Sequence, residues 1–161
     1  MKKESLVVYY SHSGNTGRIA QLIAEATGGD ILEIKPKDPY PSAYRAVVAQ
    51  AKKEILEGYH PPIGPLELDM GGYDMIFVGS PNWWSTLAPP IATFLTQSDL
   101  SGKVIAPFCT HGGGGQARVG KDMAGLASGA AALDTLAIYE NGGAGAEREV
   151  KNWLSQINRK K

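Results

Sequence analysis

Apolar residues follow two alternating patterns along this chain. Short apolar runs at residues 6–10, 31–34, 73–79, 104–110 and 132–139 are rich in residue types that favour strands. Elsewhere apolar residues recur at helical spacing. This spacing predicts helices that end at Gly28-Gly29, span about 42–58, begin at Pro89-Pro90, span about 117–127 and surround residues 150–157. Residues 59–72 contain three prolines and are expected to form a loop rather than a helix.

Five strands alternating with five helices predict an α/β fold. We expect a three-layer sandwich in which a five-stranded, parallel, doubly wound sheet carries helices on both faces. The length of 161 residues suits a single domain, 1–161. Ligands of such sheets bind outside the carboxyl ends of the strands, where the strand order reverses. The loops after the strands are therefore expected to carry the chemistry.

Composition narrows the class of protein. Hydrophobic residues make up 43% and charged residues 20%, as in a folded globular chain. Sixteen Lys and Arg balance sixteen Asp and Glu, which argues against a nucleic-acid binder. One cysteine, Cys109, and three scattered histidines exclude a disulfide framework and predict no metal site. No apolar stretch suits a signal peptide or a membrane span, so we expect a cytoplasmic protein.

The loop after the first strand suits a phosphate group. It reads SHSGNT over residues 11–16 and leads into a helix, whose first N–H groups are unpaired and lie at the positive end of the helix dipole. The loop contains no Lys or Arg, so neutral donors would hold the phosphate. The alternative is a plain helix cap, with Ser13 or Asn15 as the N-cap residue.

Two further loops suit a planar ring. The loop after the third strand reads SPNWWST over residues 80–86, and its aromatic faces could stack on a ring. The alternative is that the tryptophans fill the core, which is more plausible for one of them than for both. The loop after the fourth strand reads THGGGG over residues 110–115, and its glycines allow the backbone to approach a ligand closely. A flexible surface loop is the alternative there.

Two of these motifs resemble a known family. The run VVYYSHSGNT at residues 7–16 looks like the start of a flavodoxin, and GSPNWW at 79–84 is similar to flavodoxin-like flavoproteins with a Trp-Trp loop. The resemblance covers nearly the whole chain and implies FMN as the cofactor. It implies that the phosphate is bound by the first loop and the isoalloxazine ring by the other two. The residues implied are Ser11, His12, Ser13, Gly14, Asn15 and Thr16 for the phosphate, and Pro81, Asn82, Trp83, Trp84, Thr110, His111, Gly112, Gly113 and Gly114 for the ring.

Two departures from the family pattern bear on function. Flavodoxins that carry electrons are usually strongly acidic, whereas this chain has no net charge. Many also cover one ring face with an aromatic residue from the loop after the fourth strand, where this chain has His111 and glycines. An open ring face favours an oxidoreductase that takes electrons from NAD(P)H and passes them to a quinone or another small acceptor. An electron carrier between redox proteins, or a binding module without redox turnover, are the alternatives.

Few side chains are expected to take part in the chemistry. Hydride transfer requires no side-chain acid or base, so His111 is only a weak candidate for steadying the reduced flavin or donating a proton to a quinone. Cys109 ends a buried strand and is expected to be an inert apolar residue. Between Glu54 and Gly102 there are acidic residues but no Lys or Arg. This stretch predicts an acidic surface near the flavin that could steer a basic partner, unless basic residues from elsewhere compensate it.

Overall fold

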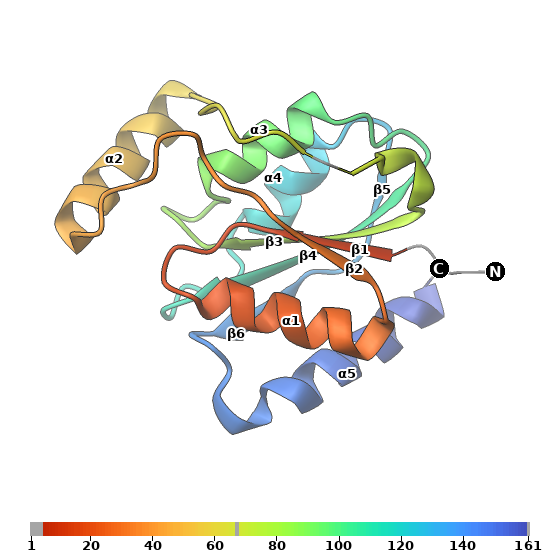
Figure 1. Cartoon of the computed structure of the whole chain (residues 1–161). Coiled ribbons are helices and arrows are strands. Elements are labelled where there is room, and N and C mark those ends of the chain that lie inside the picture. Colours follow the sequence, from red (N-terminus) through yellow and green to blue (C-terminus); the bar gives the residue numbers. More distant parts are fainter. Residues whose placement is uncertain (1–4, 67, 161) are drawn as a thin grey trace.

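The computed structural model describes residues 5–66 and 68–160, without the side chains of residues 159 and 160. Its strands and helices alternate along the chain (Figure 1). The elements are β1 (Ser5–Tyr9), α1 (Asn15–Thr27), β2 (Asp30–Glu33), α2 (Tyr44–Glu57), the 3-10 turn η1 (Met70–Gly72), β3 (Met75–Pro81), α3 (Pro89–Gln97), β4 (Val104–His111), α4 (Val119–Leu126), β5 (Ala131–Ala132), β6 (Leu136–Tyr139), the 3-10 turn η2 (Gly143–Gly145) and α5 (Ala146–Lys160).

The strands form one parallel sheet in the order β2-β1-β3-β4, and both β5 and β6 pair with the outer side of β4. This arrangement confirms the predicted doubly wound α/β fold. The chain passes from β1 to β2 on one side and then returns to β3 on the other. The strand order therefore reverses between β1 and β3, where a ligand site is expected.

The fifth strand differs from its prediction. Residues 132–139 were expected to be continuous, but β5 pairs with the beginning of β4 and β6 with its end. In the gap, the carbonyl oxygen of Asp134 accepts a 2.9 Å hydrogen bond from the indole N–H of Trp153 in α5. The apolar run continues through this break, so strand propensity alone could not show it.

Helices cover both faces of the sheet (Figure 1). α1 and α5 lie together on one face, while α2, α3 and α4 lie on the other. Each face of the sheet has its own hydrophobic core. Ile91 and Phe94 of α3 are buried in one core, and Ile19 of α1 and Trp153 of α5 are buried in the other. None of the helices in the described part of the chain is long and apolar enough to cross a membrane.

The proline-rich loop at 59–72 contacts α3 and the segment that follows β2. The hydroxyl of Thr93 donates a 2.6 Å hydrogen bond to the carbonyl of Pro61, and Ile63 forms an isolated antiparallel bridge with Pro36. The described part of the loop contains no α-helix, as predicted, and it ends in the short 3-10 turn η1. Residue 67, which this prediction included, lies outside the described residues.

Candidate functional site

A cavity of about 540 Å³ opens at the carboxyl end of the sheet. It is bounded by the loops after β1, β3 and β4, by the start of α2, and by one residue after β6. Most of the predicted site residues line it. They are His12, Ser13, Asn15, Pro81, Asn82, Trp83, Trp84, Thr110, His111 and Gly112. The remaining ones, Ser11, Gly14, Thr16, Gly113 and Gly114, belong to the same loops without lining the cavity.

The first loop is held by Ser11 rather than by the expected capping residues. The Ser11 hydroxyl oxygen accepts hydrogen bonds from the N–H groups of Gly14 and Gly17, each at 3.1 Å. Gly14 is the N-cap residue, with a φ of 97° that favours glycine. The alternative, in which Ser13 or Asn15 is the N-cap residue, is therefore excluded. Both stay free to line the cavity beside the unpaired N–H groups of the first helical turn.

A buried hydroxyl pair joins the first and third loops. Thr16 Oγ1 and Thr110 Oγ1 lie 2.7 Å apart, and both residues are buried. One hydroxyl therefore donates to the other across 94 positions in sequence. Thr16 was expected at the phosphate. Its side chain connects the first turn of α1 to the end of β4 and does not line the cavity.

Trp83 is the tryptophan that packs inward. Its ring meets Tyr10 and Tyr40 edge-on, with ring centroids 5.6 Å and 5.1 Å apart. The ring of His12 lies 6.0 Å from Trp83, and His12 Nε2–H donates a 3.2 Å hydrogen bond to the carbonyl of Pro41. His12 thus contacts both Pro41 and Trp83 through its side chain. The cluster fixes the floor of the cavity.

Trp84 lies at the surface in a strained turn. Trp83 and Thr86 exchange two backbone hydrogen bonds, of 2.8 Å and 3.1 Å, and between them Trp84 and Ser85 have φ values of 55° and 73°. Positive φ at two consecutive non-glycine residues is unfavourable and needs support from the surroundings. On one side, the Trp84 indole N–H donates to the carbonyl of Val48 in α2 at 3.1 Å.

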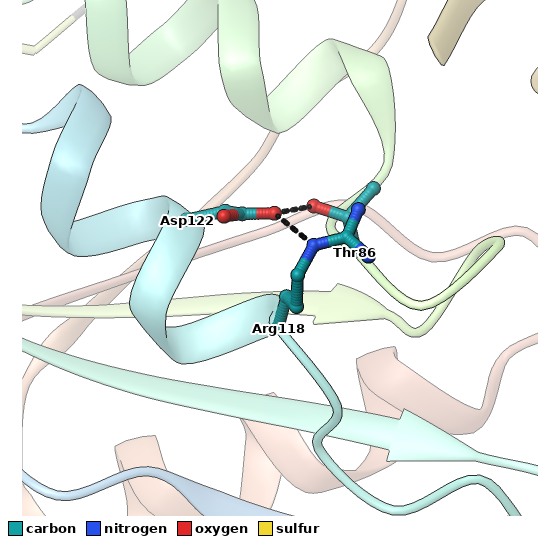
Figure 2. Close-up of polar contacts among 3 residues, drawn as sticks. All are labelled: Thr86, Arg118 and Asp122. Atoms are coloured by element: carbon teal, nitrogen blue, oxygen red, sulfur yellow. Dashed lines mark hydrogen bonds and ion pairs between the residues drawn. The ribbon is translucent and has the colours of Figure 1, made fainter. Parts of the chain in front are cut away.

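On the other side, α4 holds the same turn (Figure 2). The backbone N–H of Arg118 donates to the Ser85 carbonyl at 2.9 Å. Asp122 Oδ2 accepts a 2.5 Å hydrogen bond from the Thr86 hydroxyl and lies 3.4 Å from Arg118 Nε. We call Thr86, Arg118 and Asp122 the α4 clamp. It joins the Trp-Trp loop to α4 across 36 positions in sequence.

The third loop presents one oriented histidine. The N–H of Gly113 donates a 3.1 Å hydrogen bond to His111 Nδ1, which leaves Nε2 as the protonated nitrogen of the neutral ring. The ring stands edge-on to Tyr139 at 6.0 Å. Glu140 donates its N–H to the His111 carbonyl at 2.7 Å and lines the same cavity.

The sequence did not predict that a helix would form one wall. Ser42, Tyr44, Val47, Val48 and Ala51, in or just before α2, line the cavity together with Glu140. α2 follows the edge strand β2, and no motif in the sequence ties it to the three loops. The only signal was its apolar face, which a core helix would share.

Basic residues flank the stretch that was expected to be acidic. Lys52 Nζ lies 5.1 Å from the Trp84 ring centroid, and the α4 clamp brings Arg118 to the same loop. Glu54 is buried, and its two oxygens accept hydrogen bonds from Tyr40 Oη and Gln50 Nε2. Next to the Trp-Trp loop, the alternative that residues from elsewhere compensate the acidic stretch is therefore the better description.

Cys109 is completely buried at the end of β4, as predicted. Burial raises the pKa of its thiol to about 12, so the reactive thiolate is scarce at neutral pH. Among the described residues, no group of three His, Cys, Asp or Glu side chains could hold a metal ion.

The residues present fit a flavin mononucleotide. A phosphate finds unpaired N–H groups at the start of α1 and the side chains of Ser13 and Asn15. The nearest cation, Arg18, donates to the carbonyls of Asn141 and Gly143, so neutral groups would hold the phosphate. A planar ring finds the aromatic and backbone surfaces of the two other loops.

Comparisons with known proteins point to the same family. Residues 4–157 match the sequence profile of the family described as flavodoxin. A solved structure from Bacteroides eggerthii superposes with a TM-score of 0.84 at 28% identity, covering 98% of this chain and 99% of that chain. A flavoprotein of Lactobacillus acidophilus, solved in complex with FMN, has a TM-score of 0.76 at 25% identity, covering 95% and 99%.

One relative in sequence is named for an enzymatic activity. A Cupriavidus metallidurans protein named NAD(P)H dehydrogenase (quinone) is 32% identical over 122 residues, which are 67% of this chain and 58% of that relative. The chain thus spans somewhat over half of that relative's length. The family match itself covers almost the whole chain. This chain therefore belongs to the flavodoxin family of FMN-binding flavoproteins.

Proposed function

We propose that this protein is an FMN-dependent oxidoreductase that takes electrons from NAD(P)H and passes them to a quinone or another small acceptor. The observation that carries the proposal is the cavity, whose wall continues past the three flavin-binding loops onto the apolar side of α2. A pure electron carrier needs only an accessible flavin edge. A walled, partly aromatic cavity is what a small molecule needs.

The first loop would bind the phosphate. Ser13 and Asn15 line the cavity, and the N–H groups at the start of α1 point to the same place with the positive end of the helix dipole. Ser11 would act indirectly, because its hydroxyl oxygen holds the loop in shape.

The second and third loops would hold the ring. Asn82 Nδ2 donates a 2.9 Å hydrogen bond to the carbonyl of Gly115, which fixes the two loops against each other. Trp83 and Trp84 would form one side of the ring site, and Thr110, His111 and Gly112 would form the other. These contacts would orient the ring and limit the access of water.

When bound, FMN supplies the redox chemistry, by which NAD(P)H, one proton from solvent and a quinone give NAD(P)⁺ and a hydroquinone. The chain would contribute binding and one candidate hydrogen-bond donor to the acceptor. The Gly113 contact holds His111 in the Nε2–H tautomer, and the residue lines the cavity where the acceptor would lie. The Cupriavidus metallidurans relative, named for NAD(P)H and quinone, supports this choice of substrates.

An anaerobic titration of the FMN-loaded protein with NADPH, and then with NADH, tests the proposal. We expect direct bleaching of the flavin absorbance, followed by recovery when a quinone is added. If neither nicotinamide bleaches the flavin while a reduced redox protein does, the chain is an electron carrier. If the flavin is lost on gentle purification and does not rebind, the chain is a binding module.

A further inference from the structure

We propose that the mouth of the cavity selects a planar, uncharged ring over an anionic one, and that Glu140 is the residue that sets this preference. The inference rests on the proposed function, since it describes the acceptor that would enter the cavity. It goes further by naming the charge class of that acceptor and a residue that discriminates.

Two aromatic side chains stand exposed at the mouth. Tyr44 is 79% exposed and Trp84 is 47% exposed, although both line the cavity. Trp84 is held in place from behind by its hydrogen bond to Val48 and by the strained turn. Tyr44 begins α2 and has apolar neighbours, Val47 and Val48, along the same wall. Tyr44 and Trp84 thus provide two aromatic surfaces that a flat, apolar ring can contact.

The charged side chains that line the cavity favour an uncharged ligand. Among the described residues that line the cavity there is no Lys or Arg, and Glu140 is the one carboxylate. Lys52 lies over the Trp84 ring and Arg18 donates to the carbonyls of Asn141 and Gly143, but neither cation lines the cavity. An anionic substituent inside the cavity would meet the like charge of Glu140, and none of the described lining residues would supply a cation for it.

Glu140 is fixed where this charge matters. Its φ is 52°, and its N–H donates a 2.7 Å hydrogen bond to the carbonyl of His111. This backbone contact sets Glu140 beside His111, and both residues line the cavity. No ion pair involves Glu140 within the described part of the chain. The phosphate of the cofactor would lie at the start of α1, in the loop that offers unpaired N–H groups.

The experiment compares 1,4-naphthoquinone with 1,4-naphthoquinone-2-sulfonate, which share a ring and differ by one negative charge. Each is titrated by calorimetry into the oxidised FMN-loaded protein, where no electrons move and only binding is measured. We expect the neutral quinone to bind about fivefold more tightly, a preference of the size that like charges produce at a partly exposed site. The preference should shrink as salt is added.

Three variants assign the effect. In Glu140→Gln the ratio of the two dissociation constants should fall to near one. Glu149→Gln, an exposed position on α5, makes the same change in net charge and should keep the wild-type ratio. Tyr44→Ala should weaken both quinones together, because it removes an aromatic surface and no charge. The ratio of kcat/KM for the two quinones with NADH as donor should follow the binding ratio in each variant.

Equal affinity of the wild-type protein for the two quinones would overturn the inference, as would binding of neither. An unchanged ratio in Glu140→Gln would also reject it. These outcomes differ from failure of the proposed function, in which neither nicotinamide bleaches the flavin while the binding ratios can still be measured.

Discussion

Ser11 and Ser13 stand two positions apart in one loop and have different roles. The Ser11 oxygen accepts hydrogen bonds from two backbone N–H groups at the start of α1. The Ser13 side chain lines the cavity and has no hydrogen-bond partner among the residues that the structure describes. The family pattern includes both residues. Their geometry separates a residue that shapes the loop from one that is available to a ligand.

Ser11→Ala should lower the free energy of unfolding of the flavin-free protein by about 1 kcal/mol, the usual cost of losing a helix cap. Ser13→Ala should leave this free energy unchanged and weaken FMN binding about fivefold, since it removes one hydrogen bond to the phosphate. Urea denaturation measures the first quantity and fluorescence titration with FMN the second. Equal stability of the two variants would contradict the capping role of Ser11.

The Trp-Trp turn depends on two helices at the level of elements. α2 contributes the Val48 carbonyl, and α4 contributes the clamp of Thr86, Arg118 and Asp122 (Figure 2). Trp84 and Ser85 have unfavourable positive φ values, so we expect the turn to change conformation if either helix stops supporting it. The position of the flavin ring is therefore coupled to the packing of α4.

Asp122→Ala should lower the free energy of unfolding by about 2 kcal/mol, because it leaves the nearly buried Thr86 hydroxyl without its acceptor. It should also shift the emission of Trp84 and weaken FMN binding. Asp122→Asn keeps a carbonyl oxygen for Thr86 and should recover most of both losses.

Glu147→Ala is a matched control for this prediction. Glu147 and Lys151 form an exposed ion pair of 3.3 Å with the same spacing of four residues as Arg118 and Asp122. Its loss should cost less than about 0.5 kcal/mol and leave FMN binding unchanged. If Asp122→Ala behaves like Glu147→Ala, the clamp has no role in positioning the loop.

At the scale of the whole molecule, the fold raises the pKa of one thiol and of several phenols among the described residues. Burial raises the pKa of Cys109 to about 12, and the hydrogen bond from Tyr73 to Asp30 raises the pKa of that phenol to about 12. Burial also raises the pKa of Tyr10 and Tyr40, with Glu54 adding to both shifts. The folded protein thus holds these protons to higher pH than the unfolded chain does.

The free energy of unfolding should therefore be constant with respect to these groups below pH 9 and should fall as the pH rises from 9 to 12. The sign follows because the unfolded chain loses the protons first. Cys109 alone should contribute a loss of about 2 kcal/mol between pH 7 and pH 10.5, given its ordinary pKa of 9.0.

Urea denaturation at pH 7 and pH 10.5, in the presence of a reductant, measures this loss. Cys109→Ala lacks the thiol and should lose about 2 kcal/mol less than the wild-type protein over the same interval. Parallel pH profiles for the two proteins would show that the thiol does not titrate differently in the folded state.

The alternation of apolar patterns determined the fold class and the edge of the sheet where the site lies. Those signals are local, since a strand or helix can be read from fewer than twenty neighbouring residues. The three loops followed from topology, because the carboxyl ends of parallel strands meet at one edge. The first-loop and Trp-Trp motifs then identified the family before any contact was known.

Only the tertiary structure decided how those loops are held and what closes the cavity. The pairing of Thr16 with Thr110, the α4 clamp, and the wall formed by Tyr44 and Val48 all join residues far apart in sequence. In the break between β5 and β6, the Asp134 carbonyl accepts a hydrogen bond from Trp153, which lies in α5. Periodicity and propensity carry no information on such contacts, because these arise when separate elements pack together.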